Sequence, residues 1–211
     1  MNGATAKLGK RANPASDRIT VDGAVIIVRD DLVYYLINKP RHVVTTMSDP
    51  QGRHTVAELV PDNPRVFPVG RLDFDSEGLL LVTNDGDLAH LLMHPGSEVP
   101  KVYMAEVDGA PTRGALRSLR EGIDLEDGRT APALARAVET HGDVTLLELV
   151  IREGRNRQIR RMCEAVGHPV RRLVRTRIGP IGDPKLPPGA WRELSQDEVR
   201  KLYELVKETP V

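Results

Sequence analysis

A short polar segment between two apolar runs carries the densest group of chemically useful side chains in this sequence. Residues 69–87 read VGRLDFDSEGLLLVTNDGD, and Arg71, Asp73, Asp75 and Glu77 stand in a predicted loop that is followed by a fully apolar strand. Side chains on a loop held between rigid strands are well placed for catalysis. A carboxylate beside an arginine stays ionised and can act as a nucleophile or as a base. A plain polar turn would have the same composition, so spacing alone leaves both interpretations open.

Two further clusters could contact a ligand. Lys101 and Tyr103 begin a predicted strand, and the tyrosine ring could pack in the core or offer a flat surface to a base. In residues 151–162 (IREGRNRQIRRM), Arg157 and Arg160 are three positions apart in a predicted helix and therefore share a face. One such arginine could reach a loop carboxylate while others contact phosphates.

Basic residues are concentrated in one segment of a chain whose formal net charge is zero. From Arg152 to Arg177 there are nine arginines but only two acids, Glu153 and Glu164. The planar guanidinium is a good partner for phosphate, so this segment favours contact with a nucleic acid. A solvated helix face is the alternative explanation.

The elements that must hold these residues alternate irregularly along the chain. Because regular strand–helix–strand units are missing from the pattern, we expect an α+β fold with a largely antiparallel sheet. Apolar and β-branched runs predict strands at 19–28 (a pair around Asp22-Gly23), 32–38, 43–46, 67–69, 79–83, 102–107, 133–138, 144–151 and 171–178. Helical spacing predicts helices at 54–60, 87–93, 112–121, 156–166 and 195–206, the second, third and fifth capped by Asp87, Thr112 and Ser195.

Composition excludes several classes of protein. With 40% hydrophobic and 28% charged residues, the chain resembles an ordinary soluble globular protein, and its single cysteine excludes an internal disulfide. No apolar stretch reaches the roughly 18 residues of a membrane span, and no secretory signal is apparent. The histidines lack the spacing of metal ligands. We therefore expect a cytoplasmic protein without a metal, and a monomer because no apolar heptad is visible.

Three motifs, in order, resemble the RsuA and RluB family of pseudouridine synthases. They are GRLDFDSEGLLLVTNDG (70–86), KVYMAEVDG (101–109) and EGRNRQIRRMCEAVGHPVRRLVRTRIGPI (153–181), and the similarity runs from about Val33 to Leu194. The resemblance implies a catalytic domain over 25–207, with a mixed, mostly antiparallel sheet, flanking helices and a central RNA-binding cleft. It implies an isomerase that converts uridine of ribosomal RNA to pseudouridine. The segments DPQGRHTVAELVP and HLLMHPGSEVPKVY are more similar to RluB, which acts on large-subunit RNA.

The resemblance also implies roles for individual residues. It makes Asp73 the catalytic carboxylate, Tyr103 the ring that stacks on the target base, and Arg160 the partner of Asp73. The remaining implied substrate contacts are Arg71, which braces the loop, Lys101, Arg157 and an apolar residue below the base, either Ile178 or Val174. All atoms of the product come from the substrate, so no cofactor or metal is expected.

The N-terminal residues resemble part of a second RNA-binding domain. Residues 1–24 resemble the final strands of a small alpha-L RNA-binding domain without its helical front half, although a plain tail is an alternative. The expected partner is ribosomal RNA, most simply large-subunit RNA, or a ribosomal precursor particle. An RNA-binding module without catalysis, or a metal-dependent hydrolase that uses Asp73, Asp75 and Glu77, remain as alternatives.

Overall fold

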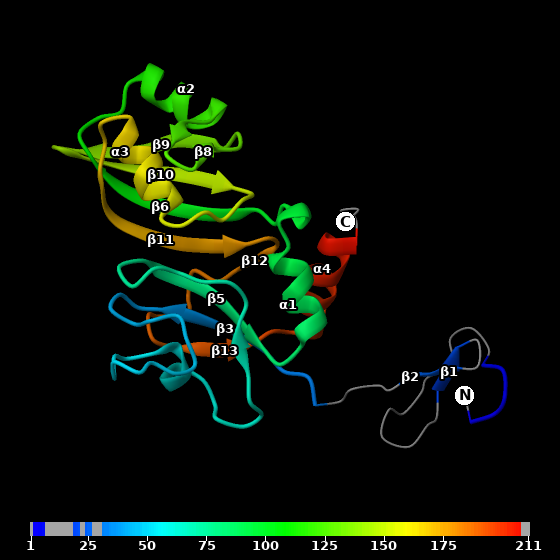
Figure 1. The fold of residues 1–211 in the computed structure, drawn as a ribbon. Helices are drawn as coiled ribbons and strands as arrows, with labels where there is room; N and C mark the ends of the chain where they lie inside the picture. The colour runs from blue at the N-terminus through cyan, green and yellow to red at the C-terminus, as the bar shows by residue number, and fades with distance from the viewer. Residues whose placement is uncertain (1, 7–18, 22–23, 27–30, 208–211) are drawn as a thin grey trace.

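The computed structural model describes residues 2–6, 19–21, 24–26 and 31–207, and its centre is a nine-stranded sheet (Figure 1). Among the described strands of this sheet, only β5 and β11 pair in parallel, and all other neighbouring strands pair antiparallel. The predicted α+β class with a largely antiparallel sheet is therefore confirmed. The main path runs in the order β13 (Trp191–Glu193), β3 (Tyr34–Lys39), β5 (Glu77–Thr83), β11 (Val170–Ile178), β6 (Lys101–Asp108), β10 (Val144–Ile151) and β9 (Leu134–His141), with β4 (Phe67–Pro68) beside β5 and β12 (Ile181–Gly182) beside β11.

Two small sheets lie outside this path. Strands β1 (Ile19–Val21) and β2 (Ala24–Ile26) form the hairpin that the sequence predicts, while its turn residues 22–23 lie outside the described residues. Strands β7 (Asp124–Leu125) and β8 (Gly128–Arg129) form a second hairpin, which was not predicted. A domain boundary near residue 24 stays a prediction.

The sheet is covered on both faces, which explains why β5 is almost continuously apolar. Leu80 and Val82 of β5 point into one core, together with residues of α2 (Arg113–Glu121) and α3 (Gln158–Ala165). Alternate residues, Leu79 and Leu81, point into a second core that contains residues of α1 (Gly86–Met93) and α4 (Gln196–Lys207). Figure 1 shows α2 and α3 at one end of the sheet and α1 beside α4 at its flank.

Several local predictions are confirmed and three need correction. Thr112 and Ser195 accept hydrogen bonds at the starts of α2 and α4, as expected. Residues 43–46 form no strand, because only an isolated bridge joins Val44 to Thr55, and residues 54–60 contain a single 3-10 turn, η1 (Val56–Leu59). A second such turn, η2 (Pro95–Ser97), follows α1.

The third correction concerns the start of α1, which Asp85 caps instead of Asp87. Helix α1 begins already at Gly86, so the side chain in the extended cap position is that of Asp85, and it accepts a 3.1 Å hydrogen bond from the Leu88 amide. The other carboxylate oxygen of Asp85 accepts hydrogen bonds from Tyr34 of β3 and Tyr203 of α4. This buried carboxylate therefore connects a strand with both helices on its face.

A glycine allows the parallel pairing that brings the two halves of the sheet together. Gly78 has φ +111° and lies so close to β11 that an added Cβ would be 2.2 Å from the carbonyl oxygen of Arg175. Only glycine combines this backbone conformation with such a close approach. Gly78 thereby fixes the distance between the Asp73 loop, which leads into β5, and the side chains of β11.

Candidate active site

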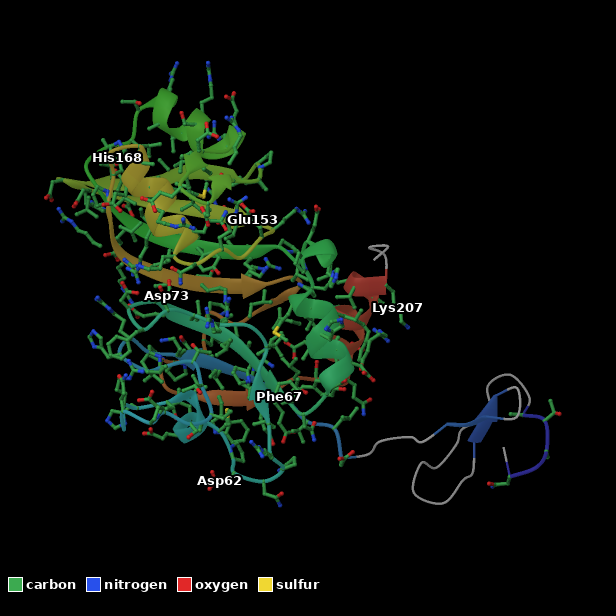
Figure 2. All side chains as sticks on the ribbon, in the orientation of Figure 1. Asp62, Phe67, Asp73, Glu153, His168 and Lys207 are labelled. Carbon is green, nitrogen blue, oxygen red and sulfur yellow. The ribbon has the colours of Figure 1, made fainter. Side chains whose placement is uncertain are left out.

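An open pocket with a volume of about 520 Å³ lies between the Asp73 loop, β6, β11 and the segment before α3. Figure 2 shows Asp73 near the middle of the molecule, where β5 and β11 lie side by side. The structure brings six of the predicted residues together, because the pocket lining includes Arg71, Asp73, Lys101, Tyr103, Arg157 and Ile178. Arg160 is not part of the lining.

The Asp73 loop is held by backbone and hydroxyl contacts on both sides. The carbonyl of Asp73 accepts a 3.1 Å hydrogen bond from the Ser76 amide, which closes a tight turn. The Thr45 hydroxyl donates to the Leu72 carbonyl at 2.7 Å, and the His42 amide donates to the Phe74 carbonyl at 2.7 Å. The carboxylate of Asp73 is consequently presented from a rigid loop, as expected for a reacting group.

The prediction that Arg160 pairs with Asp73 is wrong, because Arg160 binds Asp75. Its Nε lies 3.3 Å from Oδ2 of Asp75, and one terminal nitrogen donates to the Asp75 carbonyl at 2.9 Å. Arg157 binds the same carboxylate through two hydrogen bonds of 2.8 Å. These contacts lower the pKa of Asp75, and the hydrogen bonds from Arg157 have the largest effect. The turn directs the Asp75 side chain toward α3, whereas Asp73 faces the pocket. The sequence alone could not show which of the two aspartates would meet Arg160.

Asp73 is therefore left without a direct ion pair in the described part of the chain, yet it lies in a positive field. Lys39, Arg157 and Arg160 all interact with it electrostatically through space. A carboxylate that no guanidinium covers is open to a substrate atom. This combination suits a nucleophile or a base better than a structural ion pair would.

Arg175 is a pocket residue that the sequence analysis did not single out. Its side chain is only 4% exposed, its Nε donates to the Leu79 carbonyl at 2.7 Å, and one terminal nitrogen lies 3.5 Å from the Tyr103 hydroxyl. The other terminal nitrogen is buried without a partner among the described residues. The sequence could have indicated this residue through the alternation of side chains along β11. Arg175 is two positions after the buried Leu173, so both side chains point to the same face of the sheet.

The Tyr103 ring forms part of the pocket wall and is held in one orientation. The ring is 8% exposed, lines the pocket, and belongs to the same core as Leu173. Its hydroxyl faces the Arg175 guanidinium. A ring held in this way can offer a face to a planar base without losing much side-chain freedom.

Of the two candidates for the apolar contact, the structure places Ile178 in the pocket. Strand β11 has an irregularity between Arg175 and Arg177, which shifts the alternation so that Ile178 points inward. Val174 precedes this bulge and lies outside the lining. A one-residue change of phase of this kind is not visible in the sequence.

Two lysines near the pocket have unusual acidity. Burial lowers the pKa of Lys101 to about 8, and the charge of Arg175 adds to the effect. Burial also lowers the pKa of Lys39 to about 8, although Asp73 opposes the shift. Lys39 donates to the carbonyls of Pro40 and Val43 at 2.9 Å, so it anchors the chain next to the Asp73 loop.

Most arginines of the basic segment bind carboxylates of the chain itself. The pairs are Arg155 with Glu153, Arg157 and Arg160 with Asp75, Arg161 with Asp127, Arg171 with Asp108 and Asp143, and Arg172 with Glu77 and Glu106. The expected strip of phosphate-binding arginines is thus largely neutralised. Phosphate contact is left to positions such as Lys101 and Arg152, which donate to backbone carbonyls.

The acidic loop does not suit a metal ion. Asp75 and Glu77 are each bound by an arginine through two hydrogen bonds, so their oxygens face guanidinium groups. Within the described ranges, histidine, cysteine and acidic side chains form no cluster of three that could hold a metal. In the same ranges, no helix has the length and apolar character of a membrane span.

Comparison with known proteins identifies the family to which the chain is similar. Residues 33–165 match the family model described as RNA pseudouridylate synthase. The chain is 46% identical over 204 residues to an uncharacterized RNA pseudouridine synthase of Mycobacterium bovis, covering 95% of this chain and 80% of that protein. It is 44% identical over 193 residues to the ribosomal large subunit pseudouridine synthase B of Bacillus subtilis, covering 90% and 79%. A crystal structure of a pseudouridylate synthase superposes with a TM-score of 0.74 at 30% identity, covering 95% and 86%.

Proposed function

This chain belongs to the RNA pseudouridylate synthase family, and from that premise we propose that it isomerises uridine of large-subunit ribosomal RNA to pseudouridine with Asp73 as the catalytic carboxylate. The observation that carries the proposal is the shared pocket of Asp73, Tyr103 and the buried Arg175. A relative named for the ribosomal large subunit, at 44% identity, supports the choice of RNA.

The reaction rearranges atoms within one nucleotide. The bond between C1′ of the ribose and N1 of uracil breaks, the detached ring rotates, and C5 forms a new bond to C1′. The proton on C5 then leaves to solvent, and N1 takes up a proton, so atoms and charge balance. Asp73 supports departure of the uracil, either by attack on C1′ or as a base at the ribose.

The other pocket residues hold the uracil during this rotation. Tyr103 stacks on the detached ring, and Ile178 supplies an apolar contact below it. The unpartnered nitrogen of Arg175 donates to a substrate oxygen, because a buried guanidinium nitrogen without a partner is costly until a ligand satisfies it. A target in a helix must first leave the stack at a cost of a few kcal/mol, which contacts of Arg71 and Lys101 with the RNA offset.

The same proposal covers the cellular setting. The chain acts in the cytoplasm as a monomer, on free ribosomal RNA or on a ribosomal precursor particle, and Asp73 chemistry requires no metal or cofactor. Release of tritium from RNA labelled at uridine C5 tests it, since only a reaction that replaces the C5 proton frees the label. Large-subunit and small-subunit RNA, each naked and in precursor particles from cells without this gene, are compared in the presence of a chelator.

Release from large-subunit RNA alone is the expected result. Release from small-subunit RNA alone would overturn the choice of RNA but not the reaction. Binding of RNA without any release would favour a module without catalysis, and chelator-sensitive cleavage of the RNA without tritium release would favour the metal-dependent hydrolase.

A further inference from the structure

An exposed pair of aromatic rings lies beside the catalytic loop and outside the pocket. Phe74 follows Asp73 directly and is 45% exposed, although the whole chain has only two phenylalanines. Its ring centroid lies 5.3 Å from that of His42, with the two planes tilted by 46°. Neither residue lines the pocket that contains Asp73. An exposed aromatic surface next to a reacting group is a feature that the mechanism above does not use.

The backbone holds this ring pair in place at a conformational cost. His42 has φ +63°, a left-handed conformation that side chains other than glycine rarely adopt. Its amide donates to the Phe74 carbonyl at 2.7 Å, and Lys39 binds the carbonyls of Pro40 and Val43 on either side of it. A strained position that its neighbours fix so completely is a reason to look for a function.

An exposed cation adjoins the ring pair. Arg41 directly precedes His42 in the chain and interacts electrostatically with Glu77, whereas Arg157 and Arg172 are already bound to Asp75 and Glu77. A guanidinium group beside an exposed aromatic surface matches an RNA strand, whose bases stack on rings and whose phosphates attract cations.

We propose that the His42–Phe74 pair is a stacking surface for the unpaired base of a nucleotide next to the target uridine. The inference rests on the proposed function, because it takes RNA as the ligand. With the uridine in the pocket and its neighbour on the rings, the strand would pass over the Asp73 loop. Stacking of this neighbour would then keep the RNA open around the flipped nucleotide.

The experiment compares Phe74→Leu with Phe67→Leu, which is a matched control. Phe67 is the other phenylalanine and is 37% exposed, but it pairs with Thr83 at the far end of β5 from the catalytic loop (Figure 2). The probe is an RNA fragment spanning the target uridine, located in the reacted RNA by carbodiimide treatment and primer extension, with 2-aminopurine in place of the neighbour on one side or the other. We expect wild type and Phe67→Leu to quench one of the two labelled positions, and Phe74→Leu to lose that quenching and bind roughly tenfold more weakly.

His42→Gly separates stacking from folding. Glycine accepts the left-handed backbone without strain, so the unfolding temperature should be unchanged or higher while RNA binding weakens and the quenching decreases. Equal affinity and equal quenching for Phe74→Leu, Phe67→Leu and wild type would overturn the stacking surface and leave the enzyme assignment intact. A wild-type chain that binds ribosomal RNA but releases no tritium from any of the RNAs would overturn the proposed function, and the stacking surface with it, because there would be no target uridine.

Discussion

Replacing Arg175 by methionine tests whether the buried guanidinium acts in catalysis or only in folding. Methionine keeps most of the length but removes the charge, the 2.7 Å bond to the Leu79 carbonyl and the contact with the Tyr103 hydroxyl. Leaving the Leu79 carbonyl short of a donor costs about 1–3 kcal/mol, whereas no longer burying a charge returns part of that amount. We therefore expect the variant to fold, with a small loss of stability.

The effect on the reaction should be much larger. A preorganised donor aimed at a reacting group typically contributes about 3–4 kcal/mol to the transition state, so the single-turnover rate of tritium release should fall roughly 10²- to 10³-fold. Arg175→Lys keeps the charge but cannot contact Leu79 and Tyr103 at the same time. Its rate of tritium release should therefore lie between those of wild type and Arg175→Met.

The assay uses saturating enzyme, with thermal unfolding and RNA binding measured on the same preparations. Those two measurements separate a loss of chemistry from a loss of fold or of affinity. A folded Arg175→Met variant that releases tritium within about threefold of the wild-type rate would refute a catalytic role for Arg175.

Three further predictions concern pH, packing and helix docking. Because the charged form of Lys101 attracts phosphate and its pKa is about 8, RNA affinity measured by filter binding should fall by up to about tenfold from pH 7 to pH 9; Lys101→Arg should flatten the profile, and a steep profile in that variant would exclude Lys101 as the cause. Gly78→Ala should lower the free energy of unfolding in urea by about 2–5 kcal/mol, since its Cβ would overlap the Arg175 backbone; wild-type stability would contradict the close pairing of β5 and β11. Tyr203→Phe should cost about 1–2 kcal/mol in the same assay, because Asp85 loses one donor, and no loss would show that this bond does not help to dock α4.

The regular part of the fold was accessible from the sequence because its strands are long and strongly patterned. The predicted strands at 79–83, 102–107, 144–151 and 171–178 are confirmed with small shifts of their ends. The strands β7, β8, β12 and β13 were missed because each has only two or three residues, too few for an alternating pattern, and β13 in addition pairs with the distant β3. The α1 cap was misplaced by two residues, because the helix includes Gly86 and Asp87, whose residue types are typical of a turn.

The site was predictable as a set of residues but not as a set of contacts. Six expected residues line one pocket. Arg160, however, pairs with Asp75 instead of Asp73, and the buried guanidinium beside Tyr103 is that of Arg175. Both differences arise from side-chain direction, which depends on a tight turn in one case and on strand alternation in the other. The choice of Ile178 over Val174 depends on a bulge that only the structure reveals.

Substitution of Asp73 by asparagine is the most direct test of the central claim. Asparagine has nearly the same shape and keeps the loop contacts, which are made by backbone atoms, so RNA binding and unfolding temperature should stay close to wild type. We predict that tritium release from the RNA falls on the order of 10⁴-fold or more, as expected when a reacting carboxylate is lost. Release by Asp73→Asn at a rate near that of wild type would contradict a catalytic role of Asp73, because it would show that another residue carries the reaction.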